Sequence, residues 1–447
     1  MLVFETPAID GTVRLGLKDE STTISVDLIP SYYFDRKGRL LGGHVEHRTY
    51  RRTFDNRVIA KWSEPAGTTP ELAGIFPLDN LPVAARRRHV RRRRELPHDE
   101  ARTFIVAAHG LAARVEAALA MGSFVPTQSH SATDADIADA KARLTAIAAH
   151  DYDALARDAR QFSALYAPIG ILPPDQYLAL VLQATLGCPW NRCTFCTFYR
   201  DLDFRIRRPD EFRQHMQAVK EFHGPALSLF KGIFLADANA LIVPQQLLVQ
   251  IFDIIAEVFD IEPVDLAPAA RRTWRADHPR GFDGIYSFIS ALDALHKSPD
   301  DFAELRARGL RRAYIGLESG DEDLLRFLNK PNTARQAIEA VQKIRVGGVA
   351  VGVVIMLGIG GDRYAETHVA HTIEAVNAME LGPDDIIYFS EFVDPPNAPY
   401  VERARSQNIR QLERSEIWAQ EATMRAGFQF PDGRPKISVY DIREFIY

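Results

Sequence analysis

Short apolar runs alternate with helical stretches between residues 177 and 393, and this alternation limits the possible folds more than any other feature of the chain. The helical stretches, such as residues 211–223 and 244–259, repeat their apolar positions with a helical period. The runs between them are apolar along their whole length, which is typical of parallel strands covered by helices on both faces. They comprise residues 177–187, 226–237, 284–290, 311–319, 349–361 and 384–393. The pattern predicts an α/β fold in which six β/α units form a partial TIM-like barrel.

The segments on either side of the alternating pattern have different sequence patterns. Strand-like runs rich in β-branched and aromatic residues open the chain, and helical periodicity follows at residues 102–121, 132–150 and 151–165. Residues 64–84 are rich in Pro and Gly and predict irregular structure. We therefore expect an N-terminal α+β domain of unknown role, a barrel and a short C-terminal tail, at residues 1–172, 173–395 and 396–447.

The composition is that of a soluble globular protein, because 46% of the 447 residues are apolar and 25% are charged. The net charge of -5 gives no global reason to expect nucleic acid or an anionic membrane as a partner. The N-terminal residues lack the basic start and apolar run of a signal peptide, and no stretch reaches the ~18 uninterrupted apolar residues of a membrane span. We expect a cytoplasmic protein in a reducing compartment, with no membrane partner.

All three cysteines of the chain lie within nine residues, in the sequence LGCPWNRCTFCTFYR. Cys188, Cys193 and Cys196 are too few and too close together for a secreted disulfide framework. Thiolates bind soft metals, and a set of three leaves one position of an iron–sulfur cluster open for a small molecule. Two alternatives are buried structural thiols and a zinc site. Zinc would need a fourth ligand from outside the loop, where His215 is the nearest later histidine.

Polar and glycine-rich sequences follow several of the predicted strands. The cysteine loop follows the first strand, and Asp237 and Asn239 follow the second. Glu318 ends the fourth strand, and a Gly-Ile-Gly-Gly sequence ends the fifth. Because the carboxyl ends of parallel barrel strands meet at one rim, these side chains are predicted to share one site.

The cysteine loop and its surroundings resemble the radical S-adenosylmethionine (radical SAM) superfamily over residues 177–393. The loop has the spacing C-x4-C-x2-C, one residue longer than the commonest family spacing, and Phe195 stands where the family usually has an aromatic residue. Within the superfamily, YIGLESGDEDLLRFLNK and VVIMLGIGG are similar to the branch of oxygen-independent coproporphyrinogen oxidases and tRNA-modifying enzymes. The longer first spacing leaves the subfamily unassigned.

The resemblance implies that Cys188, Cys193 and Cys196 hold a [4Fe-4S] cluster, whose open iron binds the amino and carboxylate groups of S-adenosylmethionine (SAM). An electron from a flavodoxin or ferredoxin then cleaves SAM to methionine and a 5′-deoxyadenosyl radical, which removes hydrogen from a substrate. The expected substrate is a small metabolite or cofactor precursor, and catalytic residues stay unassigned. Residues that the resemblance places near SAM are Phe195, Asp237, Asn239, Glu318, Ser319, Gly358 and Gly360.

Each of these residues also has a simpler interpretation. Phe195 could pack in the core, and the glycines could form an ordinary turn between a strand and a helix. Glu318 could pair with an arginine such as Arg311. Ser319 could contact the SAM ribose, or it could begin the next helix with Asp321 as the N-cap.

Two basic segments have both a binding and a structural interpretation. Residues 86–94 hold seven arginines, which could contact tRNA phosphates or an acidic reductase, or lie on a surface helix paired with acidic residues. The second segment follows the cysteines and could hold an anionic substrate or the SAM carboxylate, or form a solvated loop. Its arginines are Arg200, Arg205, Arg207 and Arg208.

The sequence also bears on other classes of function. The absence of further cysteines argues against a second cysteine-held cluster, and no D-x-H-x-x-G sequence indicates cobalamin. An RNA-modifying radical SAM enzyme is an alternative that would use the arginine-rich residues 86–94. A non-catalytic iron–sulfur or zinc protein that senses redox state is the other alternative.

Overall fold

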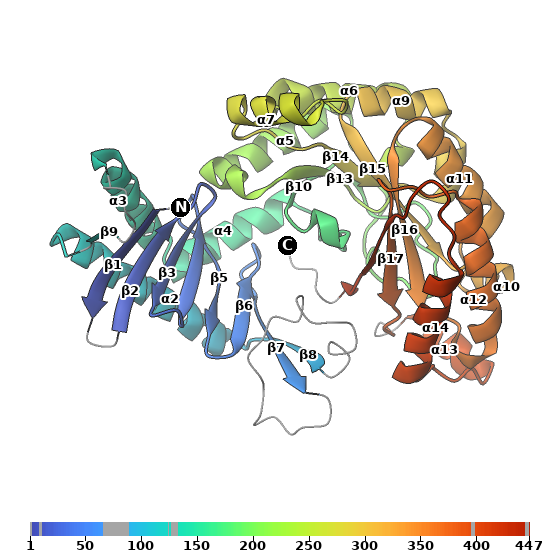
Figure 1. Cartoon of the computed structure of the whole chain (residues 1–447), viewed down its shortest axis with the longest axis horizontal. Coiled ribbons are helices and arrows are strands. Elements are labelled where there is room, and N and C mark those ends of the chain that lie inside the picture. The colour runs from blue at the N-terminus through green and yellow to red at the C-terminus, as the bar shows by residue number, and fades with distance from the viewer. Residues whose placement is uncertain are drawn as a thin grey trace. The chain divides into compact units, whose positions relative to one another are not determined.

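The structure is a computed structural model, and it divides into two compact units that are described separately (Figure 1). Unit 1 comprises Met1–Tyr166, Lys220–Leu229 and Ile446–Tyr447, and unit 2 comprises Ala167–Val219 and Phe230–Phe445. The residues that the structure describes are 2–8, 11–65, 89–123, 125–126, 133–394, 398–442 and 447.

Unit 1 contains a nine-stranded antiparallel sheet in the order β8-β7-β6-β5-β4-β3-β2-β1-β9. Most neighbours in the sheet are consecutive along the chain, so the sheet is a meander joined by short turns. Its strands are β1 (Leu2–Ala8), β2 (Gly11–Leu17), β3 (Ser21–Val26), β4 (Ser31–Asp35), β5 (Leu40–Val45), β6 (Arg48–Arg52), β7 (Val58–Pro65), β8 (His89–Glu95) and β9 (Val125–Pro126). The helices are α2 (His98–Ala120), α3 (Asp134–Ala149) and α4 (Tyr152–Leu165), which confirms the predicted α+β character.

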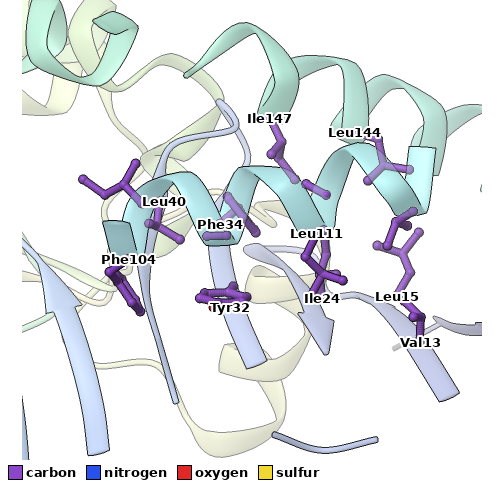
Figure 2. Packing of buried hydrophobic residues seen from close by; sticks show 14 of the residues in the cluster. Val13, Leu15, Ile24, Tyr32, Phe34, Leu40, Phe104, Leu111, Leu144 and Ile147 are labelled. Atoms are coloured by element: carbon purple, nitrogen blue, oxygen red, sulfur yellow. The ribbon is translucent and has the colours of Figure 1, made fainter. Parts of the chain in front are cut away.

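The core of unit 1 lies between one face of this sheet and helix α2 (Figure 2). Leu15, Ile24 and Phe34 come from the sheet, and Leu111 and Ile147 come from α2 and α3. Burial of such side chains is the main contribution to the stability of a unit of this kind. Among the described residues, α2 is the one helix whose length and composition would also suit a membrane span, a test that core helices of soluble proteins pass as well.

The described part of the arginine-rich segment is a strand and not a helix. His89–Glu95 forms β8, which pairs antiparallel with β7 from Ile59 to Pro65. The expectation of a surface helix at this position is therefore wrong, because pairing with β7 overrides the helical propensity of arginine. Residues 66–88, which include most of the stretch predicted to be irregular and the first arginines, lie outside the described residues.

Unit 2 contains the predicted parallel sheet. Its order is β10-β13-β14-β15-β16-β17-β18, and every neighbouring pair is parallel. The first six strands correspond to the six predicted apolar runs, so the prediction of an α/β partial barrel is confirmed. The strands are β10 (Ala179–Gln183), β13 (Gly232–Ala236), β14 (Ile285–Phe288), β15 (Leu310–Glu318), β16 (Ala350–Leu357), β17 (Ile386–Glu391) and β18 (Lys436–Val439).

Helices connect these strands and lie along the outer side of the sheet (Figure 1). Several helix starts are fixed by local capping, as at Ser298 and Thr333, whose hydroxyl oxygens accept backbone N–H groups in capping boxes. The helices are α5 (Pro209–His223), α6 (Gln245–Val258), α7 (Pro268–Asp277), α8 (Ala291–Leu295), α9 (Pro299–Ala307), α10 (Glu322–Phe327), α11 (Ala334–Val346) and α12 (Gly361–Ala378).

The predicted C-terminal tail adds to the barrel. Strand β18 is the seventh strand of the parallel sheet and pairs with β17 from Ile386 to Phe389. Two helices precede it, α13 (Pro399–Ser406) and α14 (Arg414–Gly427). The tail therefore extends the six-stranded barrel that the sequence predicts by one strand.

Candidate functional site

The cysteine loop begins at the carboxyl end of β10, where the chain leaves the sheet. A short antiparallel pair, β11 (Thr185–Leu186) and β12 (Arg205–Ile206), closes the base of the loop. Gly187 starts the loop with a φ of 72°, a conformation that favours glycine. The backbone N–H of Gly187 donates to the buried carboxylate of Asp237 at 3.4 Å, and burial raises the pKa of Asp237 to about 7. Asp237 thus links the end of β13 to the base of the loop.

Three thiols of this loop line one cavity. Cys188, Cys193 and Cys196 are free, and the N–H of Asn191 donates to Cys188 Sγ at 3.3 Å. The guanidinium of Arg200 donates to the carbonyl oxygens of Cys193 and Cys196 at 2.6 and 3.0 Å, which holds the loop closed. Burial raises the pKa of Cys193 to about 12 and also raises that of Cys196, so both thiols are protonated until a metal displaces the protons.

The donor set suits a cluster better than a single ion. No group of three or more His, Cys, Asp or Glu side chains in the described part of the chain converges closely enough to bind one metal ion. In an iron–sulfur cluster each thiolate binds a different iron, so the three sulfur atoms need not meet at one point. Soft thiolates from one loop, facing one cavity, therefore fit a [4Fe-4S] cluster.

The cavity has a volume of about 490 Å³ and opens at the carboxyl ends of the unit 2 strands. This volume lies within the ~300–1,000 Å³ that is usual for small-molecule sites. Aromatic side chains form much of its wall, and these are Trp190, Phe195, Phe198, Tyr199, Phe288, Tyr314, Phe392 and Tyr440. Phe195 also packs against the apolar cluster around Phe327, as the simpler interpretation has it, and its contact with SAM stays a prediction.

Glu318 lies in this cavity with an unusual backbone. The pairing of β15 with β16 shifts register between Gly316 and Glu318, and Glu318 has a φ of 59°. Irregularities of this kind re-aim a side chain next to a functional site. A Cβ on Gly316 would meet the Glu318 carboxylate, so a larger residue there would displace this carboxylate.

The partner of Glu318 is Lys330, which the sequence analysis missed. Lys330 Nζ lies 3.3 Å from Glu318 Oε1 and also donates to the Gly316 carbonyl at 3.0 Å. Burial alone would lower the pKa of Lys330, but Glu318, Cys193 and Cys196 together outweigh this effect and the pKa is raised. The pairing considered with Arg311 is wrong. Glu318 is seven positions after Arg311 on one strand, a distance of roughly 23 Å, and Arg311 pairs with Glu262 instead.

A second polar group of the cavity comes from the ends of β13 and β14. Asn239 is buried, and its Nδ2 donates to Asp293 Oδ2 at 2.6 Å. The N–H of Ser290 donates to Asn239 Oδ1 at 3.0 Å. The predicted residue Asn239 thus reaches the cavity, and it holds Asp293, a carboxylate that the sequence did not single out.

Four of the predicted cofactor residues do not line the cavity: Asp237, Ser319, Gly358 and Gly360. Ser319 is fully buried, and its hydroxyl lies 2.7 Å from His368 Nδ1. Asp321 is the N-cap of α10, as the simpler interpretation of this segment proposed.

The glycine sequence after β16 forms a turn covered by the C-terminal helices. The N–H of Gly358 donates to Gln420 Oε1 at 2.8 Å, and the N–H of Gly360 donates to the Tyr400 hydroxyl at 2.9 Å. Both glycines have positive φ, and Gly360 is the N-cap of α12. This geometry is that of the strand-to-helix turn in the simpler interpretation.

Three arginines that follow the cysteines form hydrogen bonds or ion pairs with other groups of the protein. Arg200 donates to the cysteine carbonyls, Arg205 pairs with Glu211 at 2.9 Å, and Arg207 donates to the Gln183 carbonyl at 2.8 Å. None of them, nor Arg208, lines the cavity. Their expected role toward an anionic ligand therefore has no support in this geometry.

One family description matches part of the chain. The family described as the radical SAM superfamily matches residues 182–373, a range that includes the cysteine loop, Glu318 and Lys330. A comparison with curated protein sequences finds no match.

Several solved structures resemble the chain at low identity. Coproporphyrinogen III oxidase (HemN) from Escherichia coli is 14% identical with a TM-score of 0.36. The matched region covers 60% of this chain and 55% of the HemN chain. Methylornithine synthase (PylB) is 13% identical with a TM-score of 0.36. The matched region covers 63% of this chain and 76% of the PylB chain. A structure of the cobalamin-dependent enzyme OxsB is 13% identical with a TM-score of 0.36, and this chain spans 31% of its length.

Proposed function

We propose that Cys188, Cys193 and Cys196 bind a [4Fe-4S] cluster that uses SAM to remove hydrogen from a small substrate, since residues 182–373 match the radical SAM superfamily. The observation that carries the proposal is the placement of the three thiols. They are the only cysteines of the chain, they lie in the matched range, and all three face one cavity.

The residues around the thiols have positioning roles in this proposal. Arg200 and Asp237 hold the ends of the loop, and Glu318 and Lys330 offer one acceptor and one donor to the charged methionine portion of SAM. Phe195 and Asn239 line the same cavity and are proposed SAM contacts. When bound, the cluster supplies the electron that cleaves SAM and so generates the hydrogen-abstracting 5′-deoxyadenosyl radical.

Several finer points of the proposal follow from the chemistry. The cluster needs an external electron, so a flavodoxin or ferredoxin is the proposed partner. Thiols that must stay reduced are suited to the cytoplasm, which is the proposed compartment. The aromatic wall excludes water from the reacting atoms, which prevents side reactions of a radical.

Anaerobic reconstitution with iron and sulfide tests this function. We expect about four irons per chain and 5′-deoxyadenosine when the protein is reduced in the presence of SAM. The triple variant Cys188→Ala/Cys193→Ala/Cys196→Ala should lose both, while Asp201→Asn, an exposed change just beyond the loop, should keep both. Circular dichroism of each variant shows whether it is folded. A wild-type protein that binds one zinc ion and does not cleave SAM contradicts the proposal.

A further inference from the structure

The charged side chains that line the cavity are mostly acidic. Four carboxylates, Asp293, Glu318, Glu391 and Asp394, face it, against one basic side chain, Lys330. No arginine belongs to the described lining. A largely apolar wall strengthens the field of uncompensated charges, because the local dielectric constant is lower than that of water.

Two of the four carboxylates are already compensated by the protein. Glu318 forms its ion pair with Lys330. Asp293 accepts hydrogen bonds from Asn239 Nδ2 and from the hydroxyl of Ser290. Asp293 lies in α8, which follows β14, and Glu318 is the last residue of β15.

The other two carboxylates lie at the end of β17. Glu391 is the last residue of that strand, and Asp394 follows three residues later. Asp394 Oδ2 accepts a hydrogen bond from Gln411, but its buried Oδ1 has no hydrogen-bond partner among the described residues. Burial raises the pKa of Asp394, so a cation bound beside it would restore the ionised form.

The proposed cofactors do not account for this acidic surplus. A cluster held by three thiolates is anionic and SAM is cationic, so the two neutralise each other at the cysteine side of the barrel. The cysteine loop follows β10, whereas Glu391 ends β17 and Asp394 comes just after it, and β10 and β17 are not neighbours in the sheet. Among the described residues neither Glu391 nor Asp394 has a cationic partner, so both carboxylates are available to a second molecule.

We infer that the substrate is a small amine or guanidine whose cationic group lies between Glu391 and Asp394 and whose apolar body lies against the aromatic wall. This inference rests on the proposed function, because it assigns the substrate class of the same cavity. The substrate is small because it shares about 490 Å³ with SAM. Aromatic faces also attract cations directly, which favours the same charge.

Isothermal titration calorimetry with three probes tests the charge preference. The probes are phenethylamine, phenethyl alcohol and phenylacetate, which share one ring and differ in charge, and the protein is the reconstituted enzyme with SAM bound. We expect phenethylamine to bind at least about 10-fold more tightly than the alcohol, and phenylacetate to bind most weakly. Glu391→Gln and Asp394→Asn should each lower that preference at least about 3-fold. Glu374→Gln, an exposed change on α12 outside the cavity, should leave it unchanged.

The outcomes separate this inference from the proposed function. Iron content and 5′-deoxyadenosine formation are measured on the same samples. If both are normal, then equal binding of the three probes, tighter binding of phenylacetate, or a preference that survives both substitutions overturns the inference alone. Samples without iron or SAM cleavage overturn the proposed function.

Discussion

Glu318 and Lys330 form an ion pair whose side chains are 11% and 12% exposed. The sequence predicted a ligand contact for Glu318 because a carboxylate ends an apolar strand at the barrel rim. Lys330 was not predicted, because it follows α10 and a turn, and no local period relates it to the strand. Pairing of this kind depends on tertiary structure and cannot be read from spacing.

Replacing Lys330 by methionine tests the energy of this pair. The variant leaves the Glu318 carboxylate buried without its cation, and we expect the free energy of unfolding to fall by about 3–5 kcal/mol. Lys141→Met, an exposed change on α3, should stay within about 0.5 kcal/mol of the wild type. Urea denaturation of the metal-free protein measures both. A Lys330 variant as stable as the control would show that the pair is open to water.

At the scale of elements, the C-terminal helices determine the shape of the glycine turn. Gln420 of α14 and Tyr400 of α13 accept the N–H groups of Gly358 and Gly360. The sequence placed Gly358 and Gly360 near SAM and offered an ordinary turn after β16 as the simpler interpretation. It could not indicate what covers that turn, because α13 and α14 lie far along the chain and their contacts are long-range. The strand β18 has only four residues, too few for a periodic signal.

The substitution Gln420→Leu tests how much the hydrogen bond between α14 and the glycine turn stabilises the protein. It removes the acceptor of the buried Gly358 N–H, and an unpaired buried donor costs about 1–3 kcal/mol of stability. Gln429→Leu, at an exposed position after α14, is the matched control and should have little effect. Thermal unfolding followed by circular dichroism compares the two. Equal midpoints would mean that water replaces Gln420 as the partner of Gly358.

At the scale of the whole molecule, the parallel sheet was predictable because each of its first six strands carries its own apolar run. The convergence of Cys188, Asn239 and Glu318 followed from topology alone, since parallel strands end at one rim. The sequence could not separate residues that face the cavity from those that pack behind it. Asp237 and Ser319 also follow strands, yet both are buried away from the cavity lining and bond to the protein.

The central claim is that three thiolates leave one iron of the cluster open for SAM. Mössbauer spectroscopy of the protein reconstituted with isotopically enriched iron tests it most directly, with spectra recorded before and after SAM is added. The account predicts that SAM changes the signal of a single iron site and leaves the other sites as they were. A spectrum that SAM does not alter, or a cluster whose irons are all bound by protein side chains, would contradict it.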